Sequence, residues 1–231
     1  MIYDPALLEV RFVRRYQRFF AEFVTIDGQQ RIAHCANTGR MTGLLEVGAR
    51  AWIRVQPPGR KLGYAWELVE TSTGMACVNT ARANGLVADA EPLSWWGPVT
   101  GVRREPRVGA HRFDLAYRTG SGCDALIEVK TVTWAVDGIG YFPDAPSARA
   151  TAHIRLLTEL ASHGQPVGVL FVAMHTGIST IRPAAMIDPA FTDALRQAAA
   201  AGVQIGARRV AVTPSALTLD AALPVELTAP G

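Results

Sequence analysis

Short segments of alternating apolar and polar residues fill the first third of the chain. The segments that fit β-strands are residues 10–14, 18–26, 30–35, 49–55, 64–70 and 75–79. Asp27-Gly28 supplies a strong hairpin turn, and residues 41–45 are long enough only for one helical turn. About five strands with one short helix in the middle is the pattern of a small Greek-key barrel. The pattern therefore predicts an OB-type β-barrel over residues 1–80.

The pattern changes after residue 80. Residues 82–91 fit a short helix, which Pro92, Trp95-Trp96, Gly97 and Pro98 then break. We place a domain junction here, so the second domain is predicted to cover residues 81–231.

Longer elements with clearer ends follow residue 105. In order, they are strands over 111–118 and 125–134 joined by a glycine turn, a helix over 147–163, a strand over 167–173, a helix over 189–201 and a strand over 203–212. Gly164 and Gly202 end the two helices. This order predicts a mixed sheet flanked by helices, an α/β (α+β) class. Residues 213–231, rich in Ala, Pro and Leu, are predicted to be peripheral.

Three ionisable residues of the predicted hairpin form a candidate catalytic site. Asp114 lies on its first strand, and alternation puts Glu128 and Lys130 on one face of the second. Residues opposite each other on paired strands lie about 5 Å apart. Two carboxylates at that distance suit Mg²⁺ or Mn²⁺, which keep several waters. One such water can attack a phosphodiester, while Lys130 orients it or neutralises the developing charge.

A solvent-exposed ion pair between Glu128 and Lys130 is the alternative. Against it, the flanking residues 125–127 and 132–134 are apolar, which indicates a central strand where free charges are costly. Lysine is also rare here, because only Lys61 and Lys130 among the 23 Lys and Arg residues are Lys.

The helix predicted over 147–163 carries two further candidates. Arg149 and His153 are spaced i, i+4 and align with Leu156 and Leu160, so this stripe should face the protein and its polar end a cleft. We predict phosphate or substrate contacts for both; a capping or core-edge pair is the alternative.

Acidic residues outside the hairpin are weaker candidates. Asp89, near the end of the helix after residue 82, is the candidate for a third metal-binding carboxylate, and Glu105 is another. Asp144 is predicted to organise the loop before the next helix.

The formal net charge of +3 is unevenly placed. Residues 1–80 hold ten Arg and Lys against seven Asp and Glu, whereas residues 81–231 hold thirteen of each. The basic residues that interleave with aromatics are Arg11, Arg14, Arg15 and Arg18, among Phe12, Tyr16, Phe19 and Phe20. Such a surface suits nucleic acid, because phosphates take the charge and bases can stack. An ordinary solvated strand face is the alternative.

Membrane and disulfide classes are disfavoured. No stretch approaches the ~18 apolar residues of a membrane span, and the charges at Asp4, Glu9 and Arg11 do not fit a secretory signal. The three cysteines are odd in number and far apart, which argues against a disulfide framework and a cysteine zinc site. We expect a soluble, cytoplasmic protein.

Several short strings occur in a distinctive order between about residues 11 and 210. They are R-x-x-x-R-Y-x-R-F at 11–19, A-H-C-x-N-T-G-R-M at 33–41, R-K-L-G-Y-A-W-E-L at 60–68, V-N-T at 78–80, N-G-L-V at 84–87, R-F-D at 112–114, E-V-K-T-V-T at 128–133, F-P-D-A at 142–145 and R-x-x-x-H at 149–153. Together these strings resemble the sugar fermentation stimulation protein family of bacteria and archaea.

The resemblance implies an OB-type domain followed by a PD-(D/E)XK nuclease-like domain. It also implies DNA binding and a part in regulating sugar (maltose) metabolism genes. The nuclease-type triad falls on Asp114, Glu128 and Lys130, with Asp89 the nearest match to an upstream acid. The residues assigned to DNA or substrate contact within the strings are Arg15, Arg18, Asn37, Arg40, Arg60, Lys61 and Arg112.

Two positions depart from the family pattern. His111 stands where the family usually has Ser, and Ala152 stands where a Lys usually precedes the helix histidine. Both changes remove phosphate contacts near the site.

Three hypotheses follow: a DNA-binding regulator, a Mg²⁺-dependent endonuclease or phosphodiesterase, and a carbohydrate- or metabolite-linked protein. The arginine-aromatic segment favours the first two. We adopt DNA binding, with metal-dependent cleavage as the alternative; the oligomeric state is left open, a homodimer included.

Overall fold

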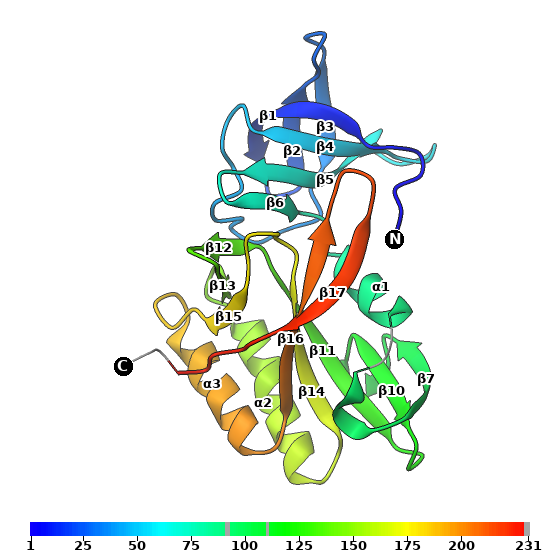
Figure 1. Ribbon diagram of the computed structural model, residues 1–231, viewed down its shortest axis with the longest axis vertical. Helices are drawn as coiled ribbons and strands as arrows, with labels where there is room; N and C mark the ends of the chain where they lie inside the picture. The colour runs from blue at the N-terminus through cyan, green and yellow to red at the C-terminus, as the bar shows by residue number, and fades with distance from the viewer. Residues whose placement is uncertain (91–92, 110, 229–231) are drawn as a thin grey trace.

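The computed structural model describes residues 1–90, 93–109 and 111–228, which form an N-terminal barrel and a larger helix-covered sheet (Figure 1). The barrel strands are β1 (Leu8–Tyr16), β2 (Phe20–Val24), β3 (Gln30–His34), β4 (Arg50–Val55) and β5 (Tyr64–Thr71), and β6 (Gly74–Cys77) extends the sheet beyond β5. Parallel pairing of β3 with β5 closes the five strands. The predicted OB-type barrel is therefore confirmed. Residues 41–45 form a single turn, closed by the Leu44 N–H and the Met41 carbonyl, and not a helix.

Three aromatic side chains pack together inside the barrel. The rings of Phe12 and Trp66 stack at 5.0 Å between centroids, and Phe23 meets Trp66 edge-on at 5.2 Å. All three are buried, and the Trp66 indole N–H donates to the Leu68 carbonyl at 2.8 Å. The three rings thus form an apolar core, and the one polar N–H among them, on Trp66, has a hydrogen-bond partner, as burial inside a closed barrel requires.

The second sheet has six strands in the order β17-β16-β14-β11-β10-β7. Their bounds are β7 (Val99–Arg104), β10 (Leu115–Thr119), β11 (Asp124–Val132), β14 (Val167–Ala173), β16 (Gln204–Val212) and β17 (Leu217–Leu223). Strands β11, β14 and β16 are parallel and the outer pairings are antiparallel. Helices α2 (Ala148–Ser162) and α3 (Pro189–Ala200) cover one face, and α1 (Arg82–Asp89) lies on the other (Figure 1). The predicted mixed-sheet class is confirmed.

Several short elements complete this part of the chain. Strands β12 (Trp134–Val136), β13 (Ile139–Phe142) and β15 (Thr180–Pro183) form a separate sheet, β8 (Arg107–Val108) pairs with β9 (His111–Arg112), and η1 (Ser94–Trp96) is a single 3-10 turn. The strand predicted over 111–118 is therefore interrupted, with Asp114 in the gap between β9 and β10. The predicted helix end at residue 91 lies outside the described residues, and α1 ends at Asp89.

The prediction that residues 213–231 are peripheral is wrong for part of that segment. Strand β17 is an edge strand paired antiparallel with β16, and Leu217 is fully buried. The Leu217 N–H donates to the Met1 carbonyl at 2.8 Å, and the Tyr3 N–H donates to the Ser215 carbonyl at 2.9 Å. The hairpin β16–β17 therefore reaches the barrel side of the molecule and pairs with the N-terminal residues (Figure 1).

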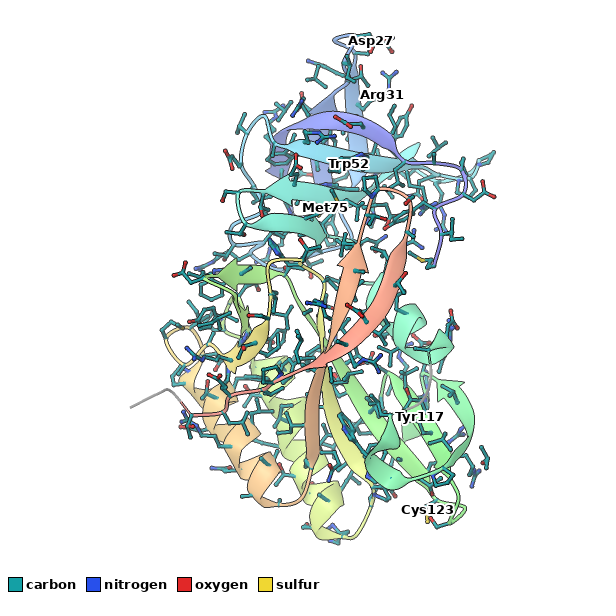
Figure 2. All side chains as sticks on the ribbon, in the orientation of Figure 1. Asp27, Arg31, Trp52, Met75, Tyr117 and Cys123 are labelled. Atoms are coloured by element: carbon teal, nitrogen blue, oxygen red, sulfur yellow. The ribbon has the colours of Figure 1, made fainter. Side chains whose placement is uncertain are left out.

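One hydrophobic cluster joins the barrel to the sheet. Trp52, Leu68 and Cys77 of the barrel pack with Ile127 and Met174, among other residues on the α1 side of the sheet. Figure 2 shows Met75 at this junction and Cys123 in the β10–β11 turn, far from the barrel. The two parts consequently share one core.

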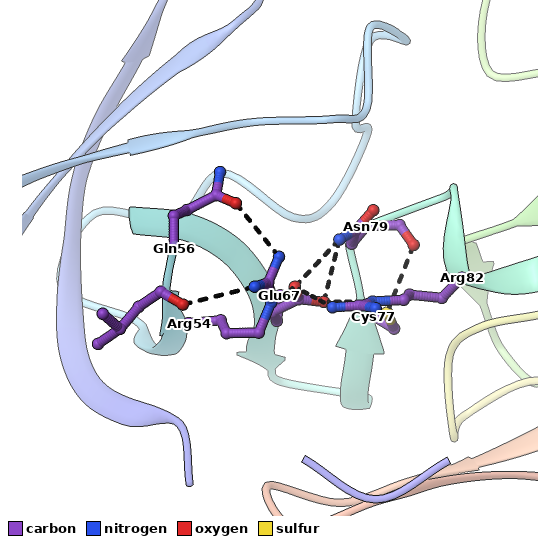
Figure 3. Close-up of polar contacts among 7 residues, drawn as sticks. Arg54, Gln56, Glu67, Cys77, Asn79 and Arg82 are labelled. Carbon is purple, nitrogen blue, oxygen red and sulfur yellow. Dashed lines mark hydrogen bonds and ion pairs between the residues drawn. The ribbon is translucent and has the colours of Figure 1, made fainter. Parts of the chain in front are cut away.

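A buried carboxylate reinforces the junction. Glu67 on β5 is fully buried and accepts hydrogen bonds from Arg54 at 2.9 Å, Asn79 at 3.1 Å and Arg82 at 2.6 Å (Figure 3). A buried charge is tolerated when paired and hydrogen-bonded in this way. Because Arg82 begins α1, these bonds fix that helix against the barrel.

His175 forms a second polar contact between the two parts. Its Nδ1 accepts the Gly177 N–H at 3.0 Å, so the proton of the neutral ring lies on Nε2, 3.0 Å from the hydroxyl of Thr71 at the end of β5. Burial lowers the pKa of His175 to about 4. None of the described helices is long and apolar enough to cross a membrane.

Candidate functional site

Asp114 occupies a position fixed by two hydrogen bonds. Its Oδ2 accepts the Val129 N–H from β11 at 2.8 Å, and its Oδ1 accepts the Asn84 side-chain amide from α1 at 2.7 Å. Burial and the nearby Glu128 carboxylate raise the pKa of Asp114, against the lowering effect of those two hydrogen bonds. The two carboxylates are therefore electrostatic neighbours, as the hairpin pattern predicted.

Glu128 and Lys130 lie next to each other on β11, in the middle of the sheet. They are only 5% and 8% exposed, and Lys130 Nζ donates to Glu128 Oε1 at 2.7 Å. His153 Nδ1 lies within hydrogen-bond distance of the same oxygen, at 2.6 Å. The alternative of a solvent-exposed ion pair is excluded, because both partners are buried.

These residues form the floor of a cleft of about 890 Å³ between the barrel and the mixed sheet. The predicted site residues that line it are Arg15, Arg18, Asn37 and Arg40 from the barrel, and Asp114, Glu128, Lys130, Arg149 and His153 from the second part of the chain. Segments far apart in the sequence thus meet around one site.

Several candidate residues do not line the cleft, Glu105 among them. Asp89 ends α1 with its side chain 74% exposed and forms an ion pair with Arg104 at 2.5 Å. Arg112 is exposed and lies 3.5 Å from Glu105. Arg60 and Lys61 are exposed in the β4–β5 connection. Asp89 is thus not brought to the other two acids, and α1 instead presents Asn84 to Asp114.

The donor set suits a hard cation that keeps much of its hydration. Among the residues that the structure describes, no group of three or more His, Cys, Asp and Glu is arranged to hold a metal. Asp114 and Glu128 remain, and Mg²⁺ commonly binds one or two carboxylates with waters and substrate oxygens completing its shell. Both hydrogen bonds to Glu128 within the described residues go to Oε1, which leaves Oε2 as a ligand. The residues present therefore fit Mg²⁺ or Mn²⁺.

Arg15 supports the loop 37–41 on the barrel side of the cleft. Its guanidinium donates to the carbonyls of Arg18 at 3.0 Å, Asn37 at 2.8 Å and Gly39 at 3.0 Å. With these bonds Arg15 shapes the loop, whereas Arg18 and Arg40 are exposed at the cleft.

Asp144 holds the same loop from the opposite side. Its Oδ2 accepts the Met41 N–H at 2.8 Å across the cleft. Gly39 passes so close that a Cβ there would lie 3.1 Å from Asp144 Oδ1 and 3.0 Å from Asn37 Oδ1. The predicted organising role of Asp144 thus extends to a loop 103 residues away in the chain.

The strand pattern missed several residues of the site. Asn84 was present only as part of a family string, and Trp134 only as an apolar strand flank. Trp134 and Tyr141 line the cleft from paired positions on β12 and β13, with ring centroids 5.1 Å apart and planes tilted by 43°. The closely spaced aromatics on both sides of Gly138 were the available signal for this pair.

Comparison with known proteins covers both parts of the chain. The family model for the SfsA N-terminal OB domain matches residues 13–78. The family model for the sugar fermentation stimulation protein RE domain matches residues 78–216. The sugar fermentation stimulation protein homologue of Thioalkalivibrio sulfidiphilus is 39% identical and covers 100% of both chains. That of Azotobacter vinelandii is 43% identical over 95% of this chain and 97% of its own.

A solved structure agrees with the sequence relatives. Pyrococcus furiosus SfsA, determined in complex with Ca²⁺, has a TM-score of 0.85 and 26% sequence identity, and the match covers 98% of both chains. With two family models and full-length relatives at about 40% identity, the chain belongs to the sugar fermentation stimulation protein family.

Proposed function

We propose that this protein binds DNA in the cleft between the barrel and the mixed sheet. One observation carries the proposal: three exposed arginines, Arg18 and Arg40 from the barrel and Arg149 from α2, surround one cleft. Within residues 1–90, 93–109 and 111–228, none of the three forms an ion pair with an acidic side chain. Their guanidinium groups are therefore available for phosphate, which arginine binds bidentately.

Salt dependence tests this proposal. If the three arginines each neutralise one phosphate, the slope of log K against log salt should be about −2 for single-stranded and about −3 for double-stranded DNA. Fluorescence anisotropy of labelled single- and double-stranded oligonucleotides measures this slope. Arg18→Ala, Arg40→Ala and Arg149→Ala should each reduce it by about one. A slope near zero for both probes would overturn DNA binding.

Two matched controls separate the cleft from general charge. Arg155 is exposed on the same helix as Arg149 but does not line the cleft. Arg11 is exposed on β1 of the barrel and does not line the cleft either. Arg155→Ala and Arg11→Ala should leave affinity within about twofold of the wild type. Equal losses from the cleft and control variants would assign binding to overall charge, contrary to the proposal.

A second candidate function is metal-dependent phosphodiester hydrolysis, which the half-buried Asp114 and the buried Glu128 and Lys130 favour. Asp114 and Glu128 would hold a divalent cation, which when bound supplies an activated water and stabilises charge. Lys130, 2.7 Å from Glu128, holds that carboxylate in place and brings a positive charge beside the reacting phosphate. The Ca²⁺ complex of the Pyrococcus furiosus relative supports divalent-cation binding in this chain too.

Cleavage is tested separately from binding. DNA incubated with Mg²⁺ or Mn²⁺ should be cleaved by the wild type and not by Asp114→Asn or Glu128→Gln. Both variants should retain DNA affinity measured without metal, because the arginines are unchanged. Wild-type binding without cleavage under either metal would refute hydrolysis and leave the binding function.

The most specific part of the proposal is that the protein regulates sugar (maltose) metabolism. This role requires a cytoplasmic location. The family name supports it, and DNA binding would supply its means. In cells that lack this gene, transcript levels of maltose genes should change and return with the wild-type protein but not with the Arg149→Ala variant. Unchanged transcripts would refute regulation without affecting either biochemical function.

A further inference from the structure

We infer that the cleft takes one unpaired DNA strand, with a base stacked on Trp134 and Tyr141, in preference to an intact duplex. This inference rests on the proposed DNA binding and names the class of DNA. Four features carry it: the volume of the cleft, the depth of its floor, the fixed loop across it, and the aromatic pair in its wall.

The volume of the cleft fits a molecule of nucleotide size. The cleft measures about 890 Å³. It lies within the ~300–1,000 Å³ range of sites that enclose molecules of nucleotide size.

The candidate catalytic residues lie at the bottom of the cleft, so DNA must enter the cleft to reach them. Glu128 and Lys130 are 5% and 8% exposed, so a phosphate reaches them only from inside the cleft. Loop 37–40 bounds the cleft on the barrel side, and residues 141–147 with Arg149 bound the opposite side. A duplex held at the mouth would leave its phosphates outside this enclosure, whereas a single strand can pass between the walls.

The two walls are held together across the cleft. The Met41 N–H bonds to Asp144 Oδ2 at 2.8 Å, and Arg15 holds the loop by its carbonyls at Asn37 and Gly39. Widening the cleft for a duplex would break the first of these bonds and open the narrow gap between Gly39 and Asp144, where an added Cβ on Gly39 would lie 3.1 Å from Asp144 Oδ1. The enclosure is therefore part of the folded state.

The aromatic pair supplies a surface that every base can use. Trp134 and Tyr141 are opposite each other on β12 and β13, both are half-buried, and both line the cleft. A base within a duplex is already stacked on its neighbours, whereas an unpaired base is free to stack on a protein ring. Arg18, Arg40 and Arg149 would hold the phosphates of the same strand.

Three probes of one sequence test the inference: a labelled 12-nucleotide single strand, a blunt duplex, and the duplex with a four-nucleotide unpaired overhang. Anisotropy without metal excludes cleavage. We expect the single strand and the overhang duplex to bind at least tenfold more tightly than the blunt duplex. Equal or tighter binding of the blunt duplex would overturn the inference while leaving DNA binding intact. No binding of any probe would overturn the proposed function itself.

Variants test the stacking contact. Trp134→Leu and Tyr141→Leu keep apolar volume but remove the ring, and should weaken single-strand binding by about 5- to 150-fold. Tyr64→Leu is the matched control, since Tyr64 is a half-buried aromatic residue on β5 that does not line the cleft. Loss of affinity equal to that of the control would overturn stacking.

A spectroscopic probe covers the case in which a Leu variant fails to fold. A 2-aminopurine at successive positions of the single strand should be quenched at one or two positions on binding to the wild type. Trp134→Phe should keep the affinity within about threefold and preserve a stacked base. Unquenched 2-aminopurine at every position of the bound strand would overturn the inference whatever the variants do.

Discussion

Replacing Glu67 by Gln should destabilise the protein strongly, because it leaves two arginines without their shared anion. Glu67 is fully buried, while the Arg54 and Arg82 side chains are 25% and 24% exposed and bond to it at 2.9 and 2.6 Å. Gln keeps the shape, but an NH₂ group replaces one carboxylate oxygen. This NH₂ group can only donate, and it would face Asn79 and the guanidinium groups, which are donors themselves. Breaking a buried pair from one side costs about 3–5 kcal/mol; partial solvent access to the arginines places our expectation near 3 kcal/mol.

Urea unfolding followed by tryptophan fluorescence measures this loss. With an m-value of about 3 kcal/mol/M for a chain of this size, the midpoint should fall by about 1 M. The matched control is Glu70→Gln on the same strand. Glu70 is 42% exposed and lies 3.4 Å from Arg50, so this variant should lower the free energy of unfolding by at most about 1 kcal/mol. If Glu67→Gln and Glu70→Gln shift the midpoint equally, the buried network does not hold the barrel to α1.

Three further measurements address other parts of the molecule. The neutral His175 has a folded pKa of about 4, below its usual value, so its contribution is fully present above about pH 6.5 and is lost as the pH falls toward 4. Urea midpoints of the wild type should therefore drop over this window by the equivalent of up to about 3 kcal/mol more than those of His175→Gln; equal slopes would refute this. Gly206→Ala should cost about 1–3 kcal/mol in the same assay, because the new methyl group would meet the Trp95 ring at about 2.5 Å; an unchanged midpoint would show that the ring moves freely. Under native conditions a thiol reagent should modify exposed Cys123 and leave Cys77, whose pKa burial raises to about 12; mass spectrometry after digestion identifies the site, and rapid labelling of Cys77 would contradict its burial.

Local patterns were sufficient for most of the fold. Strands β1–β6 and β14 follow alternation or a continuous apolar run, and α2 and α3 end at glycines with positive φ. β17 was missed because its ladder with β16 depends on pairing, which the Ala-rich composition does not signal. The sheet of β12, β13 and β15 was missed for a related reason: β15 joins it from about 40 residues downstream.

The site was predictable where it depends on strand alternation. Asp114 directly precedes β10, which pairs with β11, so it meets Glu128 and Lys130 without any contribution from the rest of the chain. The contribution of α1 was not predictable, since sequence spacing alone does not say that Asn84 contacts Asp114 and Asp89 faces solvent. Contacts between the barrel and the second part, such as Met41 with Asp144, depend on how two separately predicted units pack.

The core shared by the barrel and the sheet also has a consequence for synthesis on the ribosome. The barrel side of the cluster, Trp52, Leu68 and Cys77, is complete about 100 residues before its partner Met174 has been made. At about 5–20 residues per second, this apolar face waits roughly 5–20 s for its counterpart. During that interval the nascent barrel exposes this apolar surface, and we expect chaperones to bind it. A ribosome that stalls between β6 and β14 would release a fragment that is prone to aggregate.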